Sequence, residues 1–253
     1  ILTSLGIILG VAAVILMVAI GEGNKRAAVR DIQALGARNI IVRSQRPPES
    51  AAASGEQRSF VAKFGLEDVD WERLKHTLPD ANRMVPLKAF GSEVSYGPRR
   101  TVSQVYGTTT DLLSVLNLGV ASGGRYLVPE DELARSRVAV IGSAVADQFF
   151  PLKSPIGETI RIDDRIFMVI GVLHPVGLSG GAGVALVGRD LNLDVHIPIS
   201  TGRLEFSDSV MRRVSGSFSG EETRFSEIYI EATDADQVIQ MSRRVRRVID
   251  AGH

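Results

Sequence analysis

Residues 1–20 read ILTSLGIILGVAAVILMVAI, and this run decides what kind of chain this is. The run contains no charged residue, and only Thr3 and Ser4 are polar. Twenty helical residues span about 30 Å, the thickness of the hydrocarbon core of a bilayer. The rest of the chain could hardly enclose a helix that is apolar on every side. The run is also longer than the apolar region of a cleaved signal peptide, about 7–15 residues, so it predicts a transmembrane helix.

The helical pattern continues beyond the apolar run. After GEG comes NKRAAVRDIQALG, in which Ala28, Ile32 and Leu35 recur at helical spacing and form an apolar face. Gly36 is suited to end the helix, because glycine adopts the left-handed conformation freely. We therefore predict that residues 1–36 form a transmembrane helix that leaves the bilayer as a stalk.

Small residues line one side of the predicted membrane helix. Gly6 and Gly10 are four positions apart, and Ala13 follows nearby. A face of this kind lets a second membrane helix approach closely. Since the chain begins at Ile1 without a methionine, we expect it to be an excerpt of a longer protein.

The composition excludes several classes of function. The length of 253 residues allows one large domain or two modest ones. Hydrophobic residues make up 44% of the chain, which is enough to bury a core. Lysine plus arginine and aspartate plus glutamate both number 29, so no net charge attracts nucleic acid. The chain has no cysteine, which excludes disulfides, thiolate metal sites and cysteine nucleophiles.

The remaining sequence alternates short apolar runs with helical patterns and turn residues, which predicts an α+β fold. Strands are expected at residues 39–44, 92–96, 101–106, 137–142, 157–163, 165–173, 195–198 and 227–231. Helices are expected at residues 66–78, 129–135, 144–150 (capped by Ser143) and 234–251, and a short helix or a turn is expected at residues 111–118. The segment from residue 199 to about Gly220 is polar and predicts no element.

Two of the predicted helices have recognisable apolar sides. Helix 66–78 offers Val69, Leu74 and Leu78, and the apolar stripe of helix 234–251 consists of Val238, Met241, Val245, Val248 and Ile249. Elements near both ends of the soluble part would form one layer. The middle of the chain would then be an inserted subdomain.

Candidate catalytic motifs lack the context that they need. Residues 177–181 (GLSGG) match the nucleophile elbow of hydrolases around Ser179, but glycines follow where the elbow needs a helix. A membrane-anchored hydrolase is therefore the least favoured hypothesis. The four histidines, His76, His174, His196 and His253, show no metal-ligand spacing. We expect no catalytic, cofactor or metal site in this chain.

Four arginines form a basic patch on the predicted C-terminal helix: Arg243, Arg244, Arg246 and Arg247. They lie away from the apolar stripe, so a solvated face is the preferred interpretation. The alternative is attraction to anionic lipid.

An ordered series of segments resembles one known family. The first segments are TSLGIILGVAAVILMVAIGEG (residues 3–23) and QALGARNIIV (residues 33–42). They are followed by VYGTTTDLLSVLNLGVASGGRYL (105–127), SRVAVIGSAVADQFF (136–150) and SPIGETIRIDDRIFMVIGVL (154–173). Together they are similar to the first membrane helix and periplasmic core domain of MacB/FtsX-type ABC permeases. Residues 177–194 depart from the family, being longer and richer in glycine.

The resemblance implies a fold and a set of partners. It implies a porter-like α/β subdomain (residues 37–106 and 216–253) and an inserted Sabre-like mixed α+β subdomain (residues 107–215). It implies a permease subunit in a bacterial inner membrane, with the soluble domain in the periplasm or outside the cell. The expected partners are an ABC ATPase that binds ATP, a second permease copy, the lipid bilayer and a periplasmic adaptor.

The resemblance also implies a function. Such a subunit would relay ATP-driven motion to the extracytoplasmic domain, for export or extraction of an amphiphilic, peptide or lipoprotein substrate. The alternative is an FtsX-like membrane anchor that regulates a cell-wall hydrolase and transports nothing.

Overall fold

The computed structural model describes residues 38–45, 61–63, 65–91, 93–176, 189–206, 209–214 and 217–252, with residues 10, 12, 14–18 and 20–22 near the N-terminus. The described N-terminal residues are helical. Their large apolar side chains, from Val14 to Ile20, are 61–79% exposed. Among the described residues, no helix has the length and apolarity that a membrane crossing requires. The predicted stalk, residues 24–36, lies outside the described residues.

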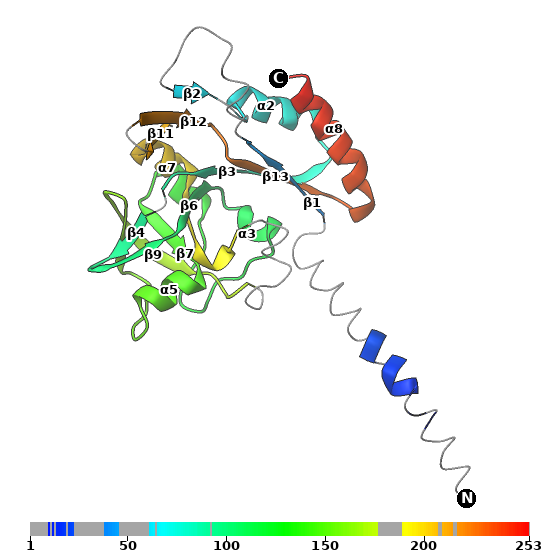
Figure 1. The fold of residues 1–253 in the computed structure, drawn as a ribbon, viewed down its shortest axis with the longest axis horizontal. Coiled ribbons are helices and arrows are strands. Elements are labelled where there is room, and N and C mark those ends of the chain that lie inside the picture. Colours follow the sequence, from blue (N-terminus) through cyan, green and yellow to red (C-terminus); the bar gives the residue numbers. More distant parts are fainter. Residues whose placement is uncertain are drawn as a thin grey trace, which may run out of the picture.

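Three antiparallel strands with two covering helices make up what we call the first part of the fold (Figure 1). These elements are β1 (Asn39–Arg43), β13 (Glu227–Ala232), β3 (Ala81–Ala89), α2 (Asp68–Thr77) and α8 (Val238–Asp250). Ile228 and Ile230 of β13 point toward the helices, and Tyr229 joins a cluster on the opposite face. This alternation is the two-residue period of a strand.

The two helices bury the faces that their sequences indicate, with one exception. Met241 and Val245 of α8 are buried, and the other three members of the predicted stripe pack around them. In α2, Leu74 is fully buried and Leu78 follows at the C-cap. Val69 is 54% exposed, so its predicted core position is wrong. The buried side runs through Asp70, Leu74 and Leu78 at intervals of four, and Val69 is rotated away from it.

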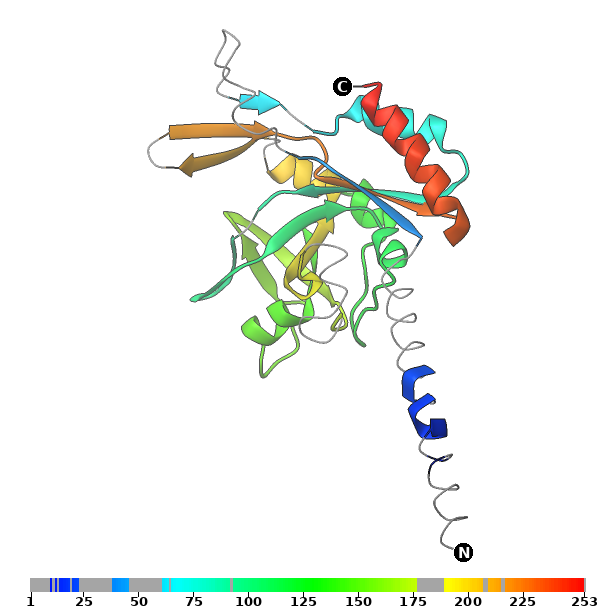
Figure 2. The same ribbon diagram turned by 45° about the vertical axis from the view of Figure 1, so that its right-hand side comes forward.

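Seven strands continue the sheet beyond β3 and form the second part of the fold (Figure 2). In spatial order they are β6 (Gln104–Thr108), β10 (Asp194–Pro198), β7 (Val138–Ile141), β9 (Arg165–Val172), β8 (Thr159–Ile162), β4 (Glu93–Tyr96) and β5 (Arg99–Val102). Short helices flank them: α3 (Leu112–Val115), α4 (Pro129–Leu133), α5 (Ser143–Phe149), η2 (Leu191–Leu193) and α7 (Ile199–Glu205). A core of aromatic and branched side chains, including Phe149, Phe167 and Val169, fills this part.

The backbone ladder that joins the two parts is short. Strand β3 pairs with β13 over most of its length and reaches β6 at Lys88 and Ala89, after which Phe90 and Gly91 hydrogen-bond to Val105. Pro86 precedes this junction. At Pro86, β3 pairs with β13 on one side and, among the described residues, with no strand on the other side. A proline is tolerated there because a residue without an N–H suits a strand side that has no partner. Side chains must therefore supply much of the contact between the parts.

Both predicted hairpins are present. Strands β4 and β5 are joined at Gly97-Pro98, and β8 and β9 are joined at Asp163-Asp164. Asp163 has φ +48°, a left-handed conformation that aspartate tolerates in turns. Residues 104–106, which were predicted to belong to the first hairpin, instead start β6.

Two predictions about local structure are wrong. Gly142, not Ser143, is the N-cap of α5, and the Ser143 hydroxyl donates to Oδ1 of Asn192 at 2.9 Å. The polar segment after residue 198 holds α7, β11 (Ser209–Val214) and β12 (Ser217–Glu222). Strands β11 and β12 form a separate small sheet with β2 (Val61–Lys63). The polar composition of this segment did not indicate strands, because the β11–β12 hairpin lies outside the main sheet.

The C-terminal helical prediction is confirmed as η3 (Ala235–Gln237) followed by α8. Of the basic patch on this helix, Arg244 pairs with Asp80, while Arg243, Arg246 and Arg247 are exposed. The predicted division of the chain at residues 107 and 215 stays a prediction. Strand β6 runs through residue 107.

Candidate functional site

The first candidate site is the junction where the chain enters the folded domain. Arg38 is the first described residue after the N-terminal helix, and β1 begins immediately after it. The carboxylate of Glu231 in β13 accepts from Nη2 of Arg38 at 3.1 Å and from Nη1 of Arg83 in β3 at 3.0 Å. It also accepts from Nδ2 of Asn82 at 2.8 Å. The buried carboxylate of Glu231 thus connects the entering chain to β13 and, through Arg83 and Asn82, to β3.

Asn39 connects the same junction to the second part of the fold. Its side-chain amide donates to the carbonyl oxygen of Val115, the last residue of α3. The backbone carbonyl of Arg38 accepts from the N–H of Ala232. Residues 38–39 therefore contact β13 and α3 directly, and they reach β3 through the carboxylate of Glu231.

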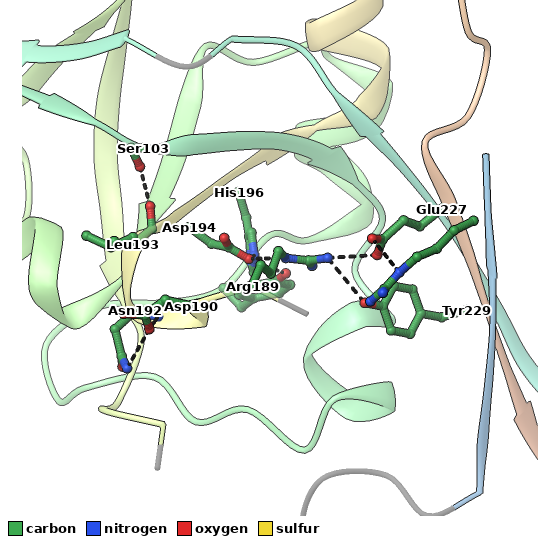
Figure 3. Close-up of polar contacts among 11 residues, drawn as sticks. Ser103, Arg189, Asp190, Asn192, Leu193, Asp194, His196, Glu227 and Tyr229 are labelled. Carbon is green, nitrogen blue, oxygen red and sulfur yellow. Dashed lines mark hydrogen bonds and ion pairs between the residues drawn. The ribbon is translucent and has the colours of Figure 1, made fainter. Parts of the chain in front are cut away.

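The second candidate site is a buried charge network between the two parts of the fold (Figure 3). Its centre is Arg189, whose side chain is 8% exposed. Nε of Arg189 donates to Oδ2 of Asp194 at 2.8 Å, and its Nη1 donates to Oε2 of Glu227 at 2.7 Å. Nη1 also lies 3.3 Å from the hydroxyl oxygen of Tyr229. The other carboxylate oxygen of Glu227 pairs with Nε of Arg43 at 3.0 Å.

The surroundings of Arg189 favour its charged form. The centre of its guanidinium lies 4.2 Å from the ring centroid of Tyr106, a favourable cation–π distance. Burial by itself disfavours the charge, but Asp194, the neighbouring tyrosines and Glu227 together raise the pKa of Arg189. Burial also raises the pKa of Tyr106 to about 12 and the pKa of Tyr229, so both phenols stay neutral. The charges of the network balance, because the carboxylates of Asp194 and Glu227 face the two arginines, Arg189 and Arg43.

A buried histidine extends the network on the β10 side. Nδ1 of His196 lies 3.0 Å from the Tyr126 hydroxyl, and its Nε2 lies 3.7 Å from Oδ2 of Asp194. Asp194 and His196 are both fully buried, and they lie two positions apart on one face of β10. No three His, Asp or Glu side chains of the described residues form a group that could hold a metal ion. The network thus connects β10 to the first part of the fold through buried polar side chains.

Most of the predicted membrane-packing and stalk-face residues, and Ser179, fall outside the described part of the chain. These residues are Gly6, Ala13, Ala28, Ile32, Leu35 and Ser179. Gly10 is helical and exposed, and among the described residues nothing outside its own helix backbone lies within 4 Å of where its Cβ would be. The predicted packing face and stalk face stay predictions.

Sequence reasoning missed both networks. A signal was present in the strand EIYIE, where Glu227, Tyr229 and Glu231 share one face by the two-residue period. Charges on a face of a central strand need partners, because an unpaired buried charge is costly.

Comparison with known proteins assigns the fold and the family. The sequence model of the MacB-like periplasmic core domain matches residues 1–248. The chain belongs to this family. Among curated relatives, the pyoverdine export ATP-binding/permease protein PvdT of Pseudomonas aeruginosa is 34% identical over 248 residues, 98% of this chain and 33% of that protein. The macrolide export ATP-binding/permease protein MacB of Syntrophobacter fumaroxidans is 34% identical over 179 residues, 70% of this chain and 24% of that protein.

Solved structures agree with the MacB-like assignment at the level of fold. The periplasmic region of MacB from Actinobacillus actinomycetemcomitans aligns with a TM-score of 0.58 at 18% identity, covering 87% of this chain and 86% of that one. The extracellular domain of the noncanonic ABC-type transporter YknZ from Gram-positive bacteria aligns with a TM-score of 0.59, also at 18% identity, covering 85% and 94%. The MacB-like chain spans a third or less of the length of the curated relatives named above.

Proposed function

We propose that this chain is the first membrane helix and the extracytoplasmic domain of an ABC transporter permease. In this proposal the permease relays ATP-driven motion from the cytoplasm to the domain, for export or extraction of an amphiphilic, peptide or lipoprotein substrate. The observation that carries it is the family match, which covers the N-terminal apolar run and the folded domain together. The ATPase would be a separate subunit or a further domain, as the names of the ATP-binding/permease relatives suggest.

The N-terminal helix supports the membrane assignment. Six large apolar side chains of its described residues, from Val14 to Ile20, are more than 60% exposed. Exposed apolar surface of this extent needs an apolar environment, and a bilayer provides one. The proposed location is a bacterial cytoplasmic membrane, with the folded domain on the extracytoplasmic side. A second permease copy and a periplasmic adaptor are the further partners that we propose.

The entry junction supports the relay. A relay needs a stiff connection between the membrane helix and the domain. Arg38 supplies a side-chain contact to β13, and Asn39 supplies one to α3. Export is favoured over the regulatory anchor because the curated relatives named above are export proteins.

A deletion test separates the relay from a passive domain. The full-length transporter would be reconstituted in lipid vesicles, and ATP hydrolysis and substrate export would be measured with and without residues 38–253. We expect that the intact protein co-purifies with ATPase activity and that the deletion abolishes export and lowers hydrolysis. Unchanged hydrolysis and export after the deletion would refute the proposal. Capture of a cell-wall hydrolase, without any ATPase, would favour the anchor.

A further inference from the structure

The two parts of the fold share few backbone pairs. Strand β3 pairs with β6 at Lys88 and Ala89, and two further backbone hydrogen bonds join Phe90 and Gly91 to Val105, whereas β13 and β3 pair along nearly their whole lengths. The strand that the entering chain forms, β1, pairs with β13 and lies at the edge of the sheet. The two parts also share an apolar core, in which Leu87 and Tyr229 pack in one cluster with Leu112. Movement of β1 must therefore reach the second part through the short ladder to β6, through this core and through polar side chains.

Arg189 bridges this boundary within the protein interior (Figure 3). On one side it holds Asp194 of β10, whose side chain has no exposed surface. On the other side it holds Glu227 of β13, whose side chain is 13% exposed. Because Glu227 also pairs with Arg43 at the end of β1, the side chains form one alternating series from β1 to β10. Figure 3 shows Arg189 extended between the two carboxylates.

The chemistry of arginine suits this bridging position. A guanidinium presents donors in a fixed planar fork, and here two of its nitrogens serve carboxylates on two different strands. A lysine ammonium is a compact point charge on a flexible stem, so it would not hold both carboxylates in the same geometry. Buried ion pairs contribute little net stability compared with apolar packing, so their presence here needs a reason other than stability.

We propose that Arg189 is a positioning residue that couples β1 and β13 to β10 and so fixes the relative position of the two parts of the fold. Its use in transport rests on the proposed function, but the coupling itself is a property of the domain. The salt bridge between Arg125 and Asp131 provides a comparison within one part of the fold, since both of its residues lie in the second part and Arg125 is 48% exposed.

Distance measurements test the coupling directly. This chain has no cysteine, so spin labels can be attached at Gln240→Cys on α8 and Leu152→Cys after α5, both of them exposed positions, once any cysteine elsewhere in the full-length protein is replaced by serine. Pulsed electron paramagnetic resonance would then report the distance between the two parts in the full-length protein in detergent. We expect one narrow distribution for the parent and for the control Arg125→Met. We expect a broader or displaced distribution for Arg189→Met, and one of intermediate width for Arg189→Lys.

A third variant separates coupling from stability. Arg189→Met alone leaves the buried Asp194 without its arginine and leaves Glu227 with Arg43 alone, so it will lower stability as well. Combining Arg189→Met with Asp194→Asn and Glu227→Gln removes those charges. We expect this triple variant to recover the unfolding midpoint of the parent in large part, yet to keep the broad distribution. A parent-like narrow distribution in the triple variant would overturn the proposal, because the charge network would then position nothing.

Export assays on the same variants distinguish this inference from the proposed function. A triple variant with a broad distribution and lost export supports both. A broad distribution with unchanged export supports the coupling and contradicts the relay. A narrow distribution overturns the coupling whatever the export rate is, and leaves the relay to be judged by the deletion test.

Discussion

Glu231 is a charged side chain inside a sheet, 5% exposed, and its partners explain why it can be there. Arg38, Arg83 and Asn82 all donate to its carboxylate, so the charge is compensated and both oxygens are bonded. Compensation of this kind is what makes a buried carboxylate tolerable. The arginines are 51% and 40% exposed, so solvent screens part of the interaction.

Replacing Glu231 by glutamine should destabilise the domain by about 1–3 kcal/mol, the range for hydrogen bonds to charged groups. The reason is that two arginines lose their shared carboxylate. The measurement is urea unfolding of the chain in detergent. The control is Glu72→Gln, which breaks an exposed pair with Lys75 and should cost less than about 1 kcal/mol. Equal losses of unfolding free energy in the two variants would show that the contacts of Glu231 stabilise the domain no more than an exposed ion pair does.

Two aspartates should give opposite pH dependences of stability. The hydrogen bond from Arg125 lowers the pKa of Asp131, so this carboxylate stabilises the fold above its ordinary pKa, about 3.9. That contribution is lost as the pH falls through the lowered pKa. Burial raises the pKa of Asp163, so Asp163 costs stability as the pH rises above about 3.9.

The paired variants Asp131→Asn and Asp163→Asn test these signs. Relative to the parent, Asp131→Asn should lose stability as the pH rises from 3 to about 6, whereas Asp163→Asn should gain it. Asparagine also tolerates the left-handed conformation of residue 163, so backbone strain does not obscure the comparison. The measurement is the urea unfolding free energy at a series of pH values. Slopes of the same sign would contradict the assignment.

At the scale of elements, the contact of α5 with η2 depends on a glycine. A Cβ on Gly142 would lie 2.2 Å from the backbone oxygen of Asn192, so no side chain fits there. Gly142→Ala should therefore destabilise the domain by about 1–3 kcal/mol through overpacking. Ser143→Ala removes only the hydroxyl bond to Asn192 and should cost about 1 kcal/mol. Thermal unfolding would show the difference, and a larger loss in Ser143→Ala would contradict the steric explanation.

Local sequence patterns were good guides to the elements and poor guides to their pairing. The hairpin turns at Gly97-Pro98 and Asp163-Asp164, the apolar stripe of α8 and the buried run of β7 all follow from short-range periodicity. The order of the strands in the sheet does not follow from such patterns. Strand β13 lies between β1 and β3, although it is far from both of them in the sequence. The candidate sites depend on that order, since Glu227 and Glu231 gain their partners only through it.

At the scale of the whole molecule, the edge strand β1 is where the chain enters the folded domain, and the larger part of the domain lies beyond β3. The entry contacts of Arg38 and Asn39 and the bridge at Arg189 lie along the connection between them. A relay built in this way needs a stiff entry and would fail if the entry became flexible.

A flexible insertion tests the relay most directly. Six glycine and serine residues would be placed between Ala37 and Arg38 of the full-length transporter, and in a control between Gly97 and Pro98, an exposed turn. ATP-driven export would be measured in vesicles alongside ATP hydrolysis. The relay predicts that the insertion before Arg38 abolishes export while hydrolysis continues, and that the control exports normally. Full export with the insertion before Arg38 would show that no motion passes through this junction.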